Sequence, residues 1–288
     1  MPEGHSVHRL ARALHRSFAG EPVAVSSPQG RFEAGAARVD GRVLERAEAW
    51  GKHLFLDFAG ELIVHVHLGL YGDFIRAALP LPEPRGAIRL RLVGERWHAD
   101  LRGPTACDLL DATDRQRILD RLGPDPLRRD ADPSLVRRRI GASRAPVAGL
   151  LMDQSVLAGV GNIYRAELLH RHEVSPFTEG RDLPADLVDA MWADLVVLMK
   201  DGVRRGRIVT VSSDDVATLA SIDADRPASD DPDLDGGEDT PARRRLRRST
   251  GVCVYRREGR DCVRCGDQVR AQDFLGRRLY WCPGCQIR

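Results

Sequence analysis

The sequence predicts an α+β protein: an N-terminal β-sandwich with a leading helix, then a helical domain, then a small C-terminal β-hairpin module that binds metal. Three observations support this order. After one amphipathic helix, short runs of alternating apolar and polar residues continue to about residue 110, as is typical of antiparallel strands. From residue 114 the apolar residues recur with a helical period. Two Cys-x-x-Cys pairs lie near the C-terminus.

The first element is a helix predicted over residues 4–18. Its apolar residues are spaced three and four apart and therefore share one face. They are Val7, Leu10, Ala11, Leu14 and Phe18. Gly20 and Pro22 follow and end the helix.

Short strands come next. Strand character is found in residues 23–25, 39–44 and 88–92. The clearest pair is 54–58 and 62–68, which the turn 59–61 joins into a predicted β-hairpin. Residues 1 to about 110 are therefore expected to form a helix and an antiparallel β-sandwich.

The middle of the chain is predicted to be helical. The segments with helical periodicity are residues 115–122, 133–140, 146–158, 162–172 and 184–200. Pro184 stands at the start of the last helix and Gly202 follows its end. Between two of the helices, residues 158–162 form a tight glycine turn.

Charge divides the C-terminal part of the chain into two segments of opposite sign. Residues 221–241 hold seven Asp, one Glu and one Arg, and almost nothing that could pack, so a disordered linker is expected. Residues 242–288 hold thirteen Arg and four acidic residues, whereas the whole chain has a net charge of +2. A basic segment beside a metal motif indicates a polyanionic partner such as nucleic acid; a solvated basic tail is the alternative.

The composition excludes a membrane protein. No apolar run approaches the roughly 20 residues that cross a bilayer. Charged residues interrupt the first twenty positions, which argues against a signal peptide, so a cytoplasmic protein is expected. The predicted division is an N-terminal domain over 1–112, a helical domain over 113–220, a linker over 221–248 and a metal module over 249–288.

Four cysteines have the spacing of a zinc site. They are Cys262, Cys265, Cys282 and Cys285, with sixteen residues between the two pairs. This pattern predicts one zinc ion bound by four thiolates, and the zinc is structural because protein ligands fill all four positions. Reduced cysteines without metal are the alternative. Cys107 and Cys253 have no paired spacing and are expected to be small buried residues.

The N-terminus offers a nucleophile. Removal of Met1 before Pro2 leaves a secondary amine, and an α-amino group titrates near pH ~7.7–8.0, so part of it is unprotonated at neutral pH. Such an amine can attack an aldehyde carbon, for example C1′ of a deoxyribose. The resulting iminium ion is an electron sink that permits β-elimination, and Glu3 can move protons beside it. The alternative is a proline that starts a helix, with an acidic residue in the first turn.

Lysine is rare in this chain. Lys52 and Lys200 are the only lysines among 44 basic residues. Because arginine does not give up its proton in a protein, a lysine here indicates chemistry that a guanidinium cannot perform. An ordinary surface charge is the alternative.

Six segments carry motifs in one order along nearly the whole chain. They are residues 1–11 (MPEGHSVHRLA), 51–54 (GKHL), 67–72 (HLGLYG), 122–125 (LGPD), 151–164 (LMDQSVLAGVGNIY) and 280–286 (YWCPGCQ). Together they resemble the formamidopyrimidine-DNA glycosylase and endonuclease VIII family of base-excision repair enzymes, and the first and last segments look like its endonuclease VIII branch. The resemblance implies a helix–two-turn–helix domain in the middle of the chain and a β-hairpin zinc finger at its end.

The resemblance also implies catalytic roles. Pro2 would be the Schiff-base nucleophile and Glu3 the general acid. Lys52 would contact a phosphate and assist elimination. Arg277 of the finger would grip the lesion phosphates and promote δ-elimination, with its neighbour Arg278 as the competing candidate.

Four further residues are implied to bind DNA. Asn162 would bind the same phosphates, although an asparagine there can also cap the next helix. Arg121 matches a DNA-binding arginine of the endonuclease VIII branch. Leu70 and Tyr71 would fill the void left by an everted base; two core residues after a strand are the alternative.

The chain departs from the family at three places. Gly69 stands where endonuclease VIII has a polar amide residue, and in this it is like the formamidopyrimidine branch. Residues 101–108 match neither branch's void-filling loop. Residues 221–246 diverge where some relatives have a loop over the lesion. The identity of the damaged base therefore stays open.

The implied function is that of a bifunctional DNA glycosylase/AP lyase. It would remove oxidised pyrimidines and cut the strand by β,δ-elimination, as a monomer with one structural zinc and damaged DNA as its partner. An oxidised-purine glycosylase is the alternative within the family. A catalytically silent DNA-binding homologue is a second alternative, against which the intact Pro2, Glu3 and Lys52 argue. A zinc-stapled transcription factor would need a separate recognition helix, and none is evident.

Overall fold

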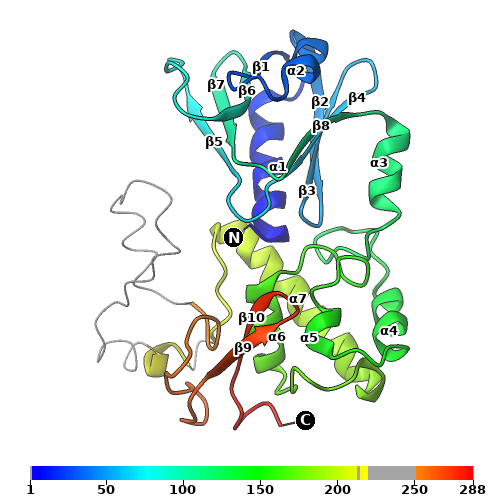
Figure 1. Ribbon diagram of the computed structural model, residues 1–288, viewed down its shortest axis with the longest axis vertical. Coiled ribbons are helices and arrows are strands. Elements are labelled where there is room, and N and C mark those ends of the chain that lie inside the picture. Colours follow the sequence, from blue (N-terminus) through cyan, green and yellow to red (C-terminus); the bar gives the residue numbers. More distant parts are fainter. Residues whose placement is uncertain (1, 213–214, 220–250, 288) are drawn as a thin grey trace. The chain divides into compact units, whose positions relative to one another are not determined.

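The computed structural model describes residues 2–212, 215–219 and 251–287 (Figure 1). These residues form two compact units, each with its own hydrophobic core. The first unit comprises the chain up to Val136, Asp153–Gly161 and Gly202–Gly206; the second comprises Arg137–Met152, Asn162–Asp201 and the described residues from Arg207 onward. The acidic segment 221–241 lies outside the described residues. The domain boundaries at 112, 220 and 248 stay predictions.

The first unit is an antiparallel β-sandwich with a leading helix, as the sequence predicts. Its elements are α1 Gly4–Phe18, β1 Pro22–Ser26, α2 Glu33–Val39, β2 Arg42–Trp50, β3 His53–Phe58, β4 Leu62–His67, β5 Asp73–Ala78, β6 Ile88–Val93, β7 Trp97–Arg102, β8 Ala106–Leu110 and α3 Ala112–Leu119. The strand order is β5-β7-β6-β1-β2-β3-β4-β8. The first part of β1 pairs with β2 and its second part with β6, so the sheet folds over at β1 into two layers.

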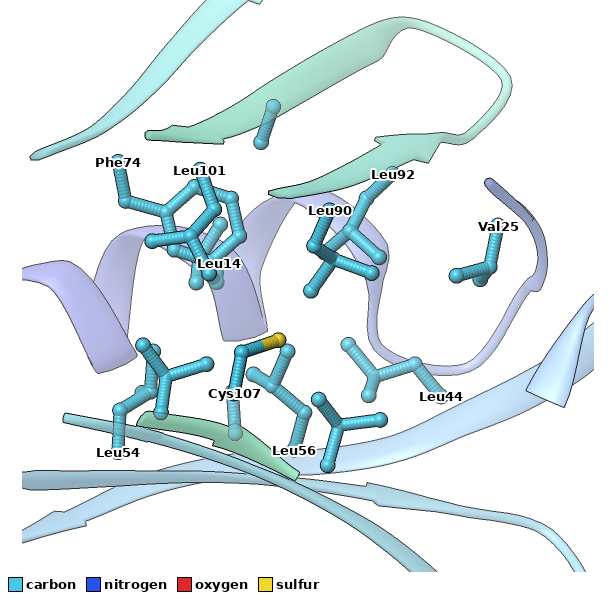
Figure 2. Close-up of a cluster of buried hydrophobic side chains, with 14 of the residues drawn as sticks. Leu14, Val25, Leu44, Leu54, Leu56, Phe74, Leu90, Leu92, Leu101 and Cys107 are labelled. Atoms are coloured by element: carbon cyan, nitrogen blue, oxygen red, sulfur yellow. The ribbon is translucent and has the colours of Figure 1, made fainter. Parts of the chain in front are cut away.

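The core lies between the two layers and takes in one face of α1. Figure 2 shows Leu90 and Leu101 in one layer facing Leu54 and Leu56 in the other, with Leu14 of α1 beside them. All five side chains are fully buried. The buried apolar positions of α1 are those of the predicted face: Val7, Ala11, Leu14 and Phe18.

Several elements of this unit differ from the prediction. The hairpin predicted at 54–58 and 62–68 is confirmed as β3 and β4. The strand predicted at 39–44 is wrong in its first part, because helix α2 extends to Val39. Only Ala36 and Val39 of α2 are buried, too few apolar contacts to produce a helical period. Strand β7 was not predicted. It lies between β5 and β6, and residues 98–101 are all buried, so its residues do not alternate between buried and exposed.

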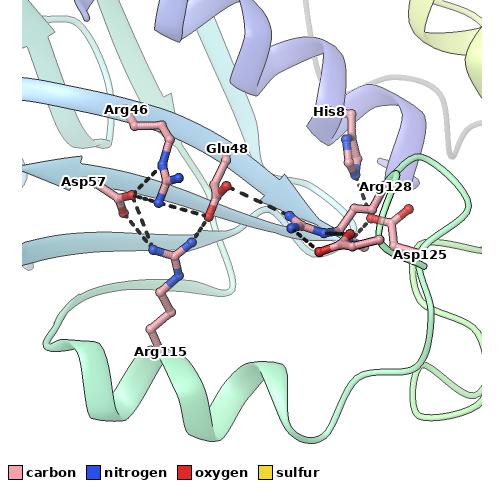
Figure 3. Close-up of polar contacts among 9 residues, drawn as sticks. His8, Arg46, Glu48, Asp57, Arg115, Asp125 and Arg128 are labelled. Carbon is pink, nitrogen blue, oxygen red and sulfur yellow. Dashed lines mark hydrogen bonds and ion pairs between the residues drawn. The ribbon is translucent and has the colours of Figure 1, made fainter. Parts of the chain in front are cut away.

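Ion pairs attach α3 to the face of the sheet that points away from the core (Figure 3). Arg115 of α3 binds Glu48 of β2, and its Nη1 lies 3.3 Å from Asp57 Oδ2 of β3. Further along the chain, the Arg128 guanidinium stacks 4.1 Å from the centre of the Trp50 ring. The start of the segment that leaves the β-sandwich is therefore fixed by charge and by stacking.

The described residues after α3 form helices and a β-hairpin. These elements are α4 Pro133–Gly141, α5 Val147–Leu150, α6 Asn162–Arg171, the 3-10 helix η1 Gly180–Asp182, α7 Ala185–Arg205, β9 Arg270–Phe274 and β10 Arg277–Trp281. The helix predicted over 146–158 is wrong beyond Leu150. Asp153 accepts a hydrogen bond from the Ser155 amide at 2.8 Å, and Gln154 accepts one from the Gly159 amide at 3.0 Å. These side chains take backbone donors that a helix would use, so the segment forms turns.

A buried carboxylate fastens the C-terminal segment to α6 in the second unit. Glu167 is fully buried, and it accepts hydrogen bonds from the amides of Cys253, Val254 and Tyr255 at 2.7, 2.9 and 2.8 Å. The Thr210 hydroxyl donates a fourth at 2.6 Å. Four donors compensate the cost of burying this charge.

In the first unit, an ion pair inside the sandwich joins β6 to β7. Arg91 Nε and Nη2 donate to the two oxygens of Asp100 at 2.7 and 2.8 Å, and both residues are 4% exposed. Arg91 Nη1 also donates to the Pro82 carbonyl at 2.9 Å. The pair therefore anchors both the two strands and the loop that precedes β6.

Replacing Asp100 should destabilise the sandwich strongly. We expect Asp100→Ala to lower the free energy of unfolding by about 3–5 kcal/mol, because it leaves the Arg91 guanidinium buried without its counter-charge. Arg117→Ala is the matched control: its pair with Asp114 is exposed (71% and 42%), and the expected change is below about 1 kcal/mol. Urea unfolding followed by circular dichroism measures both, and equal losses would contradict the anchoring role.

Candidate active site

The carboxylate of Glu3 is fixed at the N-terminal end of α1. Glu3 is fully buried in extended conformation directly before the helix, and its side chain makes no capping hydrogen bond there. Instead, its Oε2 accepts a hydrogen bond from the Gly161 amide at 3.0 Å. The neighbouring Pro2 is half-buried. An acid is thus held in one orientation next to the predicted nucleophile.

The Glu3 carboxylate packs against the predicted glycine turn, residues 158–162. Gly4 donates its amide to the Gly159 carbonyl at 2.8 Å. A Cβ on Gly161 would overlap the carboxyl group of Glu3, so only glycine fits at this position. Gln154 holds the turn from behind, because it accepts from the Gly159 amide and donates to the Val160 carbonyl, both at 3.0 Å.

A second buried carboxylate connects α1 to the turn that carries Lys52. Asp125 is fully buried, and its Oδ2 accepts the Gly51 amide at 2.7 Å and lies 2.7 Å from His8 Nε2 (Figure 3). Its Oδ1 accepts the Leu127 amide at 2.9 Å. Gly51 directly precedes Lys52, and His8 belongs to α1. The Asp125 carboxylate therefore connects the turn that carries Lys52 to helix α1. Sequence reasoning assigned Asp125 no role.

Three histidines lie next to this turn, on β3 and β4. His53 Nδ1 is 2.9 Å from His65 Nε2, and the rings of His53 and His67 are 5.0 Å apart. Burial lowers the pKa of His53 to about 3, assisted first by the neighbouring His65 and His67 and then by the charges of Arg121 and Lys52. Burial lowers the pKa of His65 to about 4. These rings are neutral at pH 7, so the positive charge beside them comes from Lys52 and Arg121.

Arg121 follows α3 and is exposed. Its Nε donates to the Arg117 carbonyl at 3.1 Å, at the end of the helix. Its charge and that of Lys52 act on the same histidine, His53. Two of the residues predicted to contact DNA therefore lie close enough to influence the same histidine of the sandwich.

Leu70 and Tyr71 lie outside the core, in the loop between β4 and β5. Leu70 is 39% exposed and Tyr71 is 87% exposed, which excludes the reading as core residues. Gly69 has φ +69°, and a Cβ there would overlap the Thr105 hydroxyl. A larger residue at position 69 is therefore blocked by both the backbone conformation and Thr105.

Asn162 fixes the C-terminal hairpin to α6 in the second unit. Its Nδ2 donates to the Arg278 carbonyl at 2.8 Å, and its Oδ1 accepts from Arg165. Asn162 is 4% exposed. Its amide thus holds the hairpin on which the finger arginines lie.

The two arginines of the hairpin differ in their partners. Arg278 Nη2 binds Glu258 at 2.8 Å, and Arg278 Nη1 lies 3.6 Å from Asp273. Arg277 is half-buried, and its guanidinium forms no hydrogen bond or ion pair within the part of the chain that the structure describes. Of the two candidates, Arg277 has the guanidinium that is available to an anion.

The four cysteines of the two pairs come together at the base of this hairpin. Their Sγ atoms all lie within 4.8 Å of one another, with Cys262 and Cys285 3.7 Å apart and Cys265 and Cys282 3.4 Å apart. These separations are too long for disulfides. They suit a tetrahedral metal with sulfur at about 2.3 Å, whose ligands lie about 3.8 Å from one another. The donor set therefore fits zinc.

The two remaining cysteines are buried, as expected. Cys107 lies in the sandwich core and Cys253 in the core of the second unit. Burial raises the pKa of the Cys107 thiol to about 12 and also raises that of Cys253. Neither thiol is available as a nucleophile at neutral pH.

Comparison with known proteins agrees with this arrangement. The formamidopyrimidine-DNA glycosylase N-terminal domain matches residues 1–107, and the formamidopyrimidine-DNA glycosylase H2TH domain matches residues 122–214. H2TH stands for helix–two-turn–helix, the domain that the sequence resemblance implied. In the described residues, no helix is long and apolar enough to cross a membrane.

Two curated relatives match along their length. "Endonuclease 8 1" of Mycobacterium tuberculosis (strain ATCC 25618 / H37Rv) is 49% identical over 99% of this chain and 100% of its own. "Probable endonuclease 8 2" of Streptomyces coelicolor is 31% identical over 99% of this chain and 94% of its own. These values place the chain among endonuclease VIII homologues.

A solved structure has the same fold. The formamidopyrimidine-DNA glycosylase of Lactococcus lactis, non-covalently bound to DNA that contains an AP site, superposes with a TM-score of 0.75 at 19% identity, over 99% of this chain and 100% of that one. The fold, the two matched domains and the 49% identical relative lead to one conclusion: the chain belongs to the formamidopyrimidine-DNA glycosylase and endonuclease VIII family of DNA glycosylases and AP lyases.

Proposed function

We propose that this protein removes oxidised pyrimidines from DNA and cuts the strand at the abasic site by β,δ-elimination, with Pro2 as nucleophile. The observation that carries the proposal is the buried carboxylate of Glu3, held by the Gly161 amide beside Pro2. The name of the 49% identical relative, an endonuclease 8, supports the same activity.

The first step forms a bond between Pro2 and the damaged nucleotide. Removal of Met1 leaves a secondary amine, whose lone pair attacks C1′. The bond from C1′ to the base breaks, and the base leaves with the proton that the amine loses. Glu3 donates a proton to the sugar ring oxygen, the ring opens, and C1′ becomes the carbon of an iminium ion.

The second step cuts the strand. The iminium ion withdraws electrons from C2′, so the Glu3 carboxylate, deprotonated by the ring opening, takes a C2′ proton and the C3′–O bond breaks with the phosphate as leaving group. In a further elimination water takes the C4′ proton and the C5′–O bond breaks with the second phosphate as leaving group, and hydrolysis of the iminium then releases Pro2. Arg277 and Lys52 neutralise the departing phosphates. A guanidinium remains a fixed cation, whereas the Lys52 ammonium can also transfer a proton.

The other predicted DNA contacts are assigned from the exposure of the side chains and from their hydrogen-bond partners. Leu70 and Tyr71 fill the space of the everted base, since unstacking a base costs a few kcal/mol that an apolar plug partly offsets. Asn162 contributes to phosphate binding indirectly, because it holds the hairpin that carries Arg277. Arg121 binds a phosphate near Lys52. The protein works as a cytoplasmic monomer on chromosomal DNA.

The four clustered cysteines hold one structural zinc. When bound, zinc supplies folding free energy to a C-terminal segment that has little core of its own. Cys262, Cys265, Cys282 and Cys285 occupy its four positions, so zinc takes no part in the elimination.

Excision of oxidised purines is the second candidate. Gly69 favours it, because glycine here is like the formamidopyrimidine branch and Thr105 prevents a polar amide residue from taking its place. Excision from duplexes that carry one oxidised pyrimidine or one oxidised purine discriminates between the two. A silent DNA-binding homologue would excise neither.

Borohydride trapping tests the nucleophile. Native protein should cross-link to an abasic oligonucleotide in borohydride, because reduction converts the iminium to a stable amine, and peptide mapping should find the adduct on Pro2. Protein with a blocked N-terminus should still bind the oligonucleotide but neither cross-link nor cut it. An adduct on Lys52 would reject Pro2, and correctly processed protein that neither cross-links nor cuts would favour the silent homologue.

The two hairpin arginines should differ in incision. Arg277→Ala should slow single-turnover incision on the order of 10²-fold, since it removes a cation from the developing phosphate charge. Arg278→Ala should slow it less than about 10-fold, because this guanidinium already binds Glu258. A reversed order would show that the register of the hairpin tip has been misassigned.

Asp125 should act as a positioning residue for Lys52. Asp125→Asn replaces an acceptor by an amide donor, so the Gly51 or Leu127 amide loses its partner, and incision should fall roughly 10-fold or more. The double variant with Lys52→Ala should be no slower than Lys52→Ala alone, because both changes remove the same contribution. Multiplying losses in single-turnover incision would instead assign Asp125 an effect that does not pass through Lys52.

A further inference from the structure

The cluster of cysteines is docked on the C-terminal end of α6. In the first Cys-x-x-Cys pair, Arg264 Nη1 donates to the His170 carbonyl at 3.2 Å. Directly after the second pair, Gln286 Nε2 donates to the Val174 carbonyl at 2.9 Å while its Oε1 accepts the Cys282 amide at 2.8 Å. Both pairs of cysteines are thus attached to carbonyls at the end of α6 and in the turn after it, and the His170 carbonyl also accepts the Glu173 amide at 3.2 Å.

One side chain of α6 reaches the sulfur atoms themselves. His170 is fully buried, and its Nε2 lies 3.3 Å from Cys262 Sγ, within hydrogen-bond distance for sulfur. Its Nδ1 has no partner among the described residues. A neutral imidazole has one N–H, and placing that proton on Nε2 gives the donor an acceptor and leaves only a lone pair unpaired.

We infer that His170 is an outer-sphere residue of the zinc site, donating its Nε2–H to the Cys262 thiolate. The inference rests on the proposed structural zinc. Four thiolates bring more negative charge than one divalent cation neutralises, and the buried Cys262 thiolate needs a hydrogen-bond donor to compensate its share of the excess. Outer-sphere donors of this kind orient metal ligands and raise metal affinity.

This hydrogen bond joins the metal to the helix that holds the hairpin. Asn162 at the start of α6 binds the Arg278 carbonyl, and His170 near its end binds Cys262. The hairpin and the cysteine cluster are therefore held at two points of one rigid helix. Loss of the His170 donor should weaken zinc retention while α6 stays folded.

Zinc release from purified, zinc-loaded full-length protein to a chromophoric chelator tests the inference. His170→Phe removes the donor and keeps an aromatic ring, and it should release zinc about 10–100-fold faster than wild type. His172→Phe is the matched control. His172 lies two residues further on, and its Nε2 is 3.2 Å from Asp194 Oδ2. Its release rate should stay within about 3-fold of wild type, because this contact is not to a zinc ligand.

Two further variants complete the experiment. His170→Gln retains an N–H donor and should recover part of the retention. His170→Leu is smaller than Phe, so the comparison holds even where the phenylalanine variant does not fold. Wild-type release from both donor-less variants would overturn the inference, as would equal acceleration in His172→Phe. If the wild-type protein binds no zinc, the proposed cofactor itself is wrong. If zinc is bound but all variants release it at the same rate, only the role of His170 is wrong.

Discussion

The candidate active site depends on one buried carboxylate, Asp125. Its two oxygens accept hydrogen bonds from His8 on α1, from the Gly51 amide beside Lys52 and from the Leu127 amide. A fully buried charge is tolerated only while its donors stay in place, so these three segments hold one another. Because Gly51 directly precedes Lys52, the same constraint reaches the predicted phosphate contact.

The second unit applies the same principle along a single helix. Four polar side chains of α6 are buried, and each binds the C-terminal segment or a residue that does: Asn162, Arg165, Glu167 and His170. Directional hydrogen bonds in a dry environment give this attachment a unique geometry, which a few apolar contacts would not provide. A small finger is thereby held by polar contacts in addition to the apolar cluster that Ala166 of α6 shares with Cys253 and Val254.

The features that were predicted correctly from the sequence are those that residues close together in the chain determine. Helix α1, the β3–β4 hairpin and the spacing of the four cysteines all follow from local patterns. The failures have distant causes: β7 is buried on both faces by its neighbours, and residues 151–158 form turns because Asp153 and Gln154 bind backbone amides. Likewise, Arg277 and Arg278 have equivalent positions in the sequence. In space they are distinguished by Glu258, some twenty residues earlier, and by Asp273 on the paired strand, both of which contact Arg278.

The contact between Thr210 and Gly251 has a consequence for changes in the length of the chain. The Thr210 amide donates to the Gly251 carbonyl at 2.6 Å, and Glu167 binds the residues on both sides of this contact. The chain between these two residues thus begins and ends at one point. A change in the length of the chain after Leu219 and before Gly251 therefore leaves this contact, and the attachment of the finger through Glu167, in place.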